Sequence, residues 1–326
     1  MSPSAERRRA DGHGYIASSL TEWEPHQEYK ACHRIGDIEP GPGALRVVGR
    51  VANLSVPSGG WKKPRNARAC VWVLLKDGTG ALAVKIWYAI ARPVLRLGQL
   101  CTLWTVFVSI EDASAMTPSA FLVSSIFPEA DSSGNFTIVE PDDGELCKDP
   151  IGYTSGEILP RLISLMDFGR VGHEIVDCIL LVCVKSVSVR KKCTNRFSQT
   201  RDKIEVVVFD DTAEATLLLW GLPAASASDW RSTLTTLLIT DPSLKASDPL
   251  SISVTAGSLF DVDPQMTEAT GLRKLAQSMM VKERVNAAFP SDVFDIYNLF
   301  DKVDKDLYTL AALDSVSVLP SSEADI

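Results

Sequence analysis

The chain has few of the residues, and none of the motifs, on which most enzyme chemistry depends. Only four of its 326 residues are histidines, three of them before residue 35, and no two cysteines have the CxxC spacing. A zinc site built from His and Cys ligands is therefore not expected. The sequence also contains no P-loop and no nucleophile-elbow motif. We expect a protein without cofactor or metal ion that is not an enzyme.

Long apolar runs and a regular cysteine framework are missing as well. The densest apolar run, IVDCILLVCV, is short and contains Asp177, so it falls well below the roughly 18 residues that span a bilayer. The N-terminus, MSPSAERRRADGHG, has no apolar core behind its arginines and does not resemble a secretory signal. Seven cysteines without regular spacing argue against a disulfide framework. These features predict a protein of a reducing compartment with no membrane partner.

The chain does contain an internal repeat. The stretch DCILLVCVKSVS (177–188) corresponds to ALRVVGRVANLS (44–55), and FDDTAEATLLLW (209–220) corresponds to KDGTGALAVKIW (76–87). Both pairs are separated by 133 residues, and in each copy a turn aspartate lies ten residues before a tryptophan. A period of this length indicates a duplicated domain and not a solenoid.

Each copy has the order strand, basic loop, two strands around a tight turn, strand, hairpin. This order predicts a mainly β protein of tandem OB folds, which are five-stranded Greek-key barrels, with connecting and C-terminal helices. An immunoglobulin-like sandwich is the alternative, but it needs about seven strands. The expected segments are a disordered tail (1–30), OB domain 1 (31–130), a linker (131–160), OB domain 2 (161–265) and a C-terminal helical segment (266–326).

Positive charge is concentrated in the loop that follows the first strand of each copy. The chain has a net charge of −8, whereas loop 56–69 carries four cations and no acid, and loop 189–203 carries six cations and one acid. In an OB barrel this loop closes over an oligonucleotide, where cations neutralise phosphates. A merely solvated loop is the alternative. The candidate residues are Lys62, Lys63, Arg65, Arg68, Arg190, Lys191, Lys192, Arg196, Arg201 and Lys203.

Aromatic side chains at matching places supply candidates for base stacking. Trp87 and Trp220 end the third strand of their copies, and Trp61 and Phe197 lie within the basic loops. Phe121 is a candidate on the hairpin of the first copy. Stacking on an exposed ring holds single-stranded nucleic acid without regard to sequence. Core packing is the alternative for each of these rings.

Three motifs resemble the DNA-binding OB domains of the replication protein A large-subunit family, and most closely its meiosis-specific OB-domain relatives and their fungal homologues. They are IGDIEPGPGALRVVGRV at the entry to a barrel, FDDTAEATLLLWG at the strand pair, and DVDPQMTEATGLRKL at the exit. The resemblance implies single-stranded DNA binding in meiotic recombination or DNA repair in the nucleus. It gives Trp220 the stacking role, and makes other OB-fold or recombination proteins candidate partners.

Two departures from this family stand out. The second copy has no aromatic residue between Trp230 and Phe260, where the family usually offers a second stacking ring. The third OB domain with its zinc ribbon is also missing from the pattern. Two other functions stay open: an OB-fold scaffold subunit that does not bind nucleic acid, and a metal-dependent nuclease using Asp210, Asp211, Asp261 and Asp263.

Overall fold

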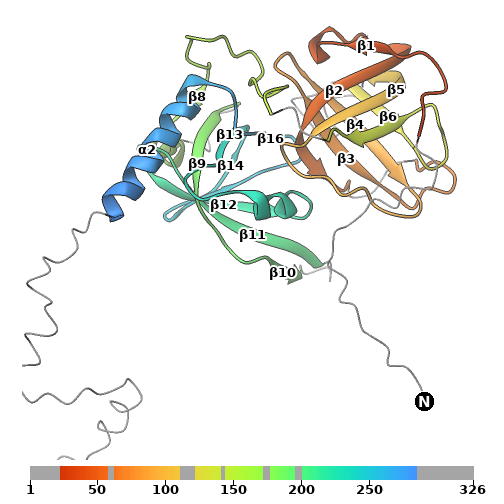
Figure 1. The fold of residues 1–326 in the computed structure, drawn as a ribbon. Coiled ribbons are helices and arrows are strands. Elements are labelled where there is room, and N and C mark those ends of the chain that lie inside the picture. Colours follow the sequence, from red (N-terminus) through yellow and green to blue (C-terminus); the bar gives the residue numbers. More distant parts are fainter. Residues whose placement is uncertain are drawn as a thin grey trace, which may run out of the picture. The chain divides into compact units, whose positions relative to one another are not determined.

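The computed structural model describes residues 23–57, 62–110, 122–140, 144–171, 177–194 and 200–284. The protein is mainly β, with two sheets and few helices (Figure 1). Both sheets belong to one compact unit that ends at Gln277. Among the helices described, none is long and apolar enough to cross a membrane.

The first sheet closes into a five-stranded barrel. β2 is paired with both β3 and β5, β3 with β4, and β6 closes the ring between β4 and β5. The short strand β1 extends the sheet beside β2, and β7 adds to β5. The bounds are β1 (Lys30–Cys32), η1 (Ile35–Asp37), β2 (Gly41–Ser55), β3 (Ala69–Lys76), β4 (Ala81–Tyr88), β5 (Leu100–Ile110), β6 (Leu122–Ile126) and β7 (Asn135–Ile138).

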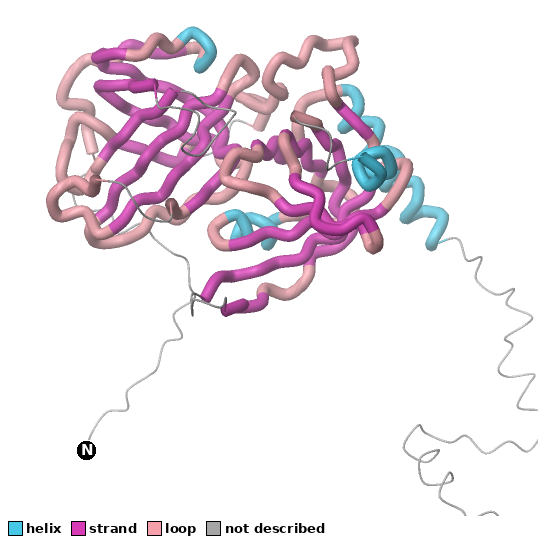
Figure 2. The backbone as a smooth tube through the Cα atoms, turned by 180° about the vertical axis from the view of Figure 1, so that it is seen from behind, coloured by secondary structure: helices cyan, strands magenta, loops and turns pink. Residues whose placement is uncertain are grey.

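The second sheet repeats this order of pairing as a curled half-barrel (Figure 2). β9 is paired with β11 and β13, β11 with β12, and β12 with β15, which runs parallel to it as β6 does to β4. The bounds are β8 (Leu162–Ile163), α1 (Leu165–Val171), β9 (Ile179–Val187), β10 (Lys191–Thr194), β11 (Thr200–Phe209), β12 (Glu214–Trp220), η2 (Pro223–Asp229), β13 (Thr236–Thr240), β14 (Ser243–Ser247), β15 (Leu250–Ser253), β16 (Leu259–Val262) and α2 (Thr267–Arg284).

The shared topology confirms the predicted fold class, mainly β with tandem OB-like domains. Alternation along the strands fills each interior, because successive side chains of a strand point to opposite faces. Val71, Val73 and Leu75 of β3 are buried inside the first barrel. The β11 residues Val206 and Val208, each 133 positions after its equivalent Val73 or Leu75, are buried in the same way. The residues between them face outward, and these outer faces are where the two copies differ.

The turn aspartate of each copy anchors the segment that enters the barrel. The Asp77 carboxylate accepts the backbone N–H groups of Thr79 at 2.7 Å and of Gly80 at 3.0 Å, which closes the turn between β3 and β4. Its second oxygen accepts the N–H of Ile35 at 2.7 Å, so the turn also holds η1. The role of this turn is therefore to fasten the entry segment to the ribbon.

Asp210 makes the same set of bonds in the second copy. It accepts the N–H groups of Thr212 at 2.8 Å and of Ala213 at 2.9 Å, and that of Leu165, at the start of α1, at 2.6 Å. The hydroxyl of Thr212 donates to it as well, at 2.7 Å. The repeat thus extends to individual hydrogen bonds.

The structure places two segments differently from the sequence prediction. Residues 23–30, assigned above to a disordered tail, lie against the first barrel: the Trp23 ring is 5.0 Å from that of Trp104, and the Tyr29 hydroxyl donates to the Ser133 carbonyl at 2.8 Å. Residues 135–138, assigned above to the linker, form β7. Both segments have few apolar residues among many polar and charged ones, so the sequence showed no periodic pattern in them. The tail up to residue 22 and the C-terminal segment beyond residue 284 lie outside the described residues.

Buried polar contacts join the two barrels. The Lys76 ammonium, at the end of β3, is paired with the carboxylate of Asp261 on β16, and both side chains are buried. Asn53 of β2 donates to the carbonyl oxygens of Thr255 at 2.9 Å and Ser258 at 2.6 Å. The segment from 255 to 261 of the second copy is thus held against the outside of the first barrel.

Candidate nucleic-acid interface

The basic loop of the second copy is built as a two-stranded ribbon. β10 pairs with β11 in antiparallel register from Lys191 opposite Lys203 to Thr194 opposite Thr200. β12 ends at Trp220, opposite Lys203, and the Gly221 N–H donates to the Asp202 carbonyl at 2.8 Å. The part of β11 before Asp202 is paired with β10 (Figure 1). The ribbon therefore extends beyond the edge of β12 and presents two surfaces.

Register and alternation sort the cations of this ribbon onto its two faces. Residues directly opposite one another, and residues two apart on one strand, share a face. One face carries Lys191, Cys193, Arg201, Lys203 and, on β12, Trp220. We call this set the basic face. Lys192 lies on the other face, as does Asp202, which is paired with Arg190.

An exposed indole lies in contact with a cation on the basic face. The Trp220 side chain is 41% exposed, an unusual value for a tryptophan in a strand, and the Lys203 ammonium lies 5.4 Å from its ring centroid. Lys203 also donates to the carboxylate of Glu205 at 2.7 Å. This hydrogen bond and the lysine charge lower the pKa of Glu205 below its ordinary value, so the carboxylate is ionised at neutral pH.

The corresponding indole of the first copy is not exposed, which corrects the expectation for Trp87. Its side chain is 5% exposed and packs with Cys70 and Phe127. The indole N–H donates to the Ser125 hydroxyl at 3.0 Å. Trp87 lies on the outer face of β4, but Phe127, forty residues away in the sequence, covers it. A ring in this position offers no surface on which a base could stack.

The outer face of the first barrel is covered over most of its length. Trp72 and Leu74 of β3 are buried with Ala83 of β4, and Leu259 of the second copy joins the same apolar cluster. Lys85 is also buried, with its ammonium 5.2 Å from the Trp72 ring. In the second copy, the residues at the equivalent positions include Lys203, Glu205 and Trp220, all of them partly or fully exposed. The first copy uses this face for packing, whereas in the second copy α2 covers the end near Phe209 and the end with Lys203 and Trp220 is exposed.

The remaining candidates divide into two groups. In the first copy Lys62, Lys63, Arg65 and Arg68 are exposed, and the backbone N–H of Arg68 donates to the Tyr88 carbonyl at 2.9 Å, which places that end of the loop beside the end of β4. They form a cationic surface without an exposed indole among the described residues nearby. The other candidates, Trp61, Phe121, Arg196 and Phe197, lie outside the described residues.

Glu205 is a residue of the basic face that the sequence did not predict. It follows the basic loop 189–203 by two residues, and its negative charge is opposite to that of the candidate residues. The available signal was the alternation of β11, because Glu205 follows Lys203 by two residues and must share its face.

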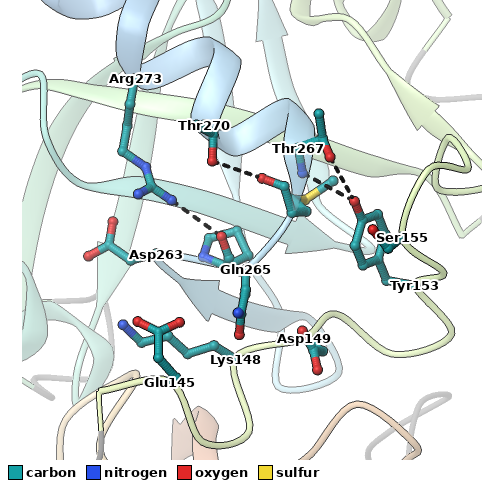
Figure 3. A pocket seen from close by; sticks show the side chains of 12 residues that line it. Glu145, Lys148, Asp149, Tyr153, Ser155, Asp263, Gln265, Thr267, Thr270 and Arg273 are labelled. Carbon is teal, nitrogen blue, oxygen red and sulfur yellow. Dashed lines mark hydrogen bonds between the residues drawn. The ribbon is translucent and has the colours of Figure 1, made fainter.

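A cavity beside the start of α2 lies away from the basic face. It has a volume of about 440 Å³ and is lined by residues from the linker and the start of α2 (Figure 3). Tyr153 accepts the N–H of Thr267 at 3.1 Å, and Arg273 donates to the Pro264 carbonyl at 3.3 Å. Carboxylates and cations mix in its wall, so its charge selects no ligand class.

The acids of the nuclease hypothesis have structural contacts. Asp210 closes a turn, Asp261 is paired with Lys76, and Asp263 accepts the N–H of Thr236 at 3.0 Å. Within the described ranges, no group of three or more His, Cys, Asp or Glu side chains has the geometry to hold a metal ion.

Comparison with known proteins supports the fold and leaves the family open. No protein-family model matches the chain, and no curated protein sequence matches it. Among solved structures it is similar to a replication protein A heterotrimer bound to ssDNA, with a TM-score of 0.50 and 14% identity over 76% of this chain. The match covers 55% of that chain, so the protein spans about half its length. At this identity the likeness shows a shared fold.

Two further structures resemble parts of the chain much more loosely. The replication factor A related protein from Methanobacterium thermoautotrophicum matches with a TM-score of 0.25 and 14% identity, over 32% of this chain and 91% of that one. The crystal structure of fission yeast Pot1 and ssDNA matches with a TM-score of 0.24 and 9% identity, over 74% of this chain and 91% of that one. Within the described residues, the fold and the site together define a tandem OB-like protein whose second copy has an exposed, basic outer surface.

Proposed function

We propose that this protein binds single-stranded nucleic acid through its second barrel. The observation that supports the proposal is the basic face, where the exposed Trp220 indole shares one surface with Lys191, Arg201 and Lys203. Single-strand binding needs both elements: cations follow the phosphate backbone, and an aromatic ring stacks on a base.

The arrangement gives each part of the face a task. The ribbon of β10 and β11 provides cations at successive positions along its length, so it can neutralise neighbouring phosphates. Trp220, at the base of the ribbon, would stack on one base of the same strand. Lys203 lies between the two, close enough to serve either the phosphate or the ring.

The finer parts of the proposal rest on the resemblance of the sequence motifs. We infer that the ligand is single-stranded DNA, that binding is not accompanied by catalysis, and that the protein acts in the nucleus in meiotic recombination or DNA repair. The motifs FDDTAEATLLLWG and DVDPQMTEATGLRKL support this inference.

A second function is favoured for the first barrel. Its outer face is already covered, in part by Leu259 and by the segment that Asn53 and Lys76 hold. The first barrel therefore serves as a scaffold that supports the second. This assigns to one copy the scaffold role that the sequence leaves open for the whole chain.

Fluorescence anisotropy with labelled oligo-dT tests the proposal. We expect Trp220→Ala to weaken binding about fivefold or more, since one stacked base contributes about 1–3 kcal/mol. Trp87→Phe is the matched control: it changes the equivalent residue of the other copy, keeps a buried ring, and leaves binding within about twofold of the unmodified protein. Equal losses in the two variants, or affinity that does not change with salt, would refute the assignment.

A further inference from the structure

One acidic side chain lies within the basic face. Glu205 follows Lys203 by two residues on β11 and is opposite Leu218 on β12, while Lys203 is opposite Trp220. Glu205 therefore lies two residue pairs along the ladder from Trp220, in the next pair on the same side of the sheet.

The position of this carboxylate is fixed by its neighbours. Lys203 donates to it at 2.7 Å, and the same ammonium lies 5.4 Å from the Trp220 ring centroid. The Glu205 backbone is held on both sides by Ser188, whose Oγ accepts its N–H at 2.9 Å and whose own N–H donates to its carbonyl at 2.9 Å. Because both distances start from the same ammonium, the carboxylate oxygen lies within about 8 Å of the centroid of the indole ring.

The chemistry of the ligand limits what this carboxylate can bind. An ionised carboxylate only accepts hydrogen bonds, and the phosphates and sugars within a DNA strand donate none. The donors of DNA are the amino and imino groups on base edges. Guanine can donate two hydrogen bonds side by side, and cytosine and adenine each have an amino group. Thymine has one N–H group between two carbonyl oxygens, which repel a carboxylate.

We propose that Glu205 selects the base that stacks on Trp220, favouring bases with an exocyclic amino group over thymine. This inference rests on the proposed function of the same face. On binding, Lys203 turns from the carboxylate to a phosphate, and Glu205 exchanges the lysine for a base amino group. The site then combines sequence-independent stacking with a preference at one position.

The test compares the affinities of three labelled oligonucleotides of equal length: oligo-dT, oligo-dC, and oligo-dT with one central dG. For the unmodified protein we expect binding to the dG-containing strand and to oligo-dC to be about fivefold tighter or more than binding to oligo-dT, at the low end of what a good base contact provides. In Glu205→Gln the ratios fall to about one, because a neutral amide can donate to thymine as well as accept.

Glu214→Gln is the matched control. Glu214 is also an exposed glutamate paired with a lysine, Lys185, and it shares its side of β12 with Trp220. It lies six residues away, about 20 Å along the strand, beyond the reach of a base stacked there. The control removes the same charge and should keep the ratios of the unmodified protein.

The outcomes separate this inference from the function on which it rests. Ratios near one in the unmodified protein, or ratios unchanged in Glu205→Gln, would overturn it while leaving single-strand binding intact. If Glu205→Gln bound all three oligonucleotides more tightly by the same factor, Glu205 would act only as a negative charge that repels the phosphate backbone. That result would overturn the inference too. If no strand binds to the unmodified protein, the proposed function fails and the inference falls with it.

Discussion

At the scale of single residues, one aspartate in each copy holds both a tight turn and the segment that enters the barrel. Asp210 accepts three backbone N–H groups and one hydroxyl. We expect Asp210→Ala to lower the free energy of unfolding by about 2 kcal/mol or more, because partly buried donors lose a charged acceptor. Urea denaturation measures the change.

The neighbouring aspartate supplies the control for this change. Asp211 is exposed, and its replacement by alanine should alter the free energy of unfolding by no more than about 0.5 kcal/mol. Similar losses for both variants would contradict the anchoring role.

The same residues show how far the sequence can be followed. The spacing of Asp77 and Asp210 was visible as a repeat, and with it the strand order and the fold class. The sequence did not predict that the backbone N–H groups of Ile35 and Leu165 bind these carboxylates. A short apolar segment contains no signal for the turn against which it packs.

At the scale of elements, the ribbon of β10 and β11 separates two neighbouring lysines by face. Lys191 shares its face with Trp220, and Lys192 points to the opposite side. We expect Lys191→Ala to reduce the slope of log affinity against log salt by about 0.7, the value of one phosphate contact on a single strand. Oligo-dT titrations between 50 and 200 mM salt, roughly the range over which such contacts are resolved, measure it.

Lys192→Ala removes the same charge from the adjacent position and is the control. It should leave the slope nearly unchanged. If the two variants reduced the slope equally, the ribbon would be acting as a diffuse positive charge, and the assignment of one face to the ligand would be wrong.

The environment of distant elements explains why the two indoles differ in exposure although they hold the same place in the repeat. Both lie on the outer faces of their strands, β4 and β12. What covers an outer face comes from distant segments: Phe127 lies over Trp87, and Leu259 joins the cluster around Trp72. Local periodicity contains no information about such neighbours, so the open and the covered copy look alike in sequence.

At the scale of the whole molecule, the buried pair of Lys76 and Asp261 joins the two barrels. Burial raises the pKa of Asp261, and the lysine charge opposes that rise. We expect Lys76→Met to cost about 3–5 kcal/mol of stability, since it leaves a carboxylate buried without its partner. Adding Asp261→Leu should recover most of the loss, because an apolar pair of similar size replaces the ions.

The pH dependence of Lys76→Met follows from the same carboxylate. Without the lysine, the pKa of Asp261 in the folded state rises further above its value in the unfolded chain, so the folded state binds the extra proton. The variant therefore loses stability as pH rises from the unfolded pKa, about 4, toward the folded value. Urea denaturation at pH 4.5 and pH 8, roughly on either side of this window, should show the larger loss at the higher pH.

Arg96 and Asp229 form a second ion pair between the copies and supply the control. Their side chains are 39% and 56% exposed, so Arg96→Met should cost at most about 1 kcal/mol. A comparable loss for the exposed and the buried pair would show that burial does not govern the junction between the barrels.

The covered indole of the first copy has a consequence for how such molecules occupy a strand. Tandem modules that both grip a ligand gain avidity, because the second contact forms at a high local concentration once the first is made. In the proposed function the second copy alone stacks on the strand, so the residence time of each molecule would be that of one contact. Dense coverage of a long strand would then depend on the supply of protein, and each molecule could be exchanged or displaced independently.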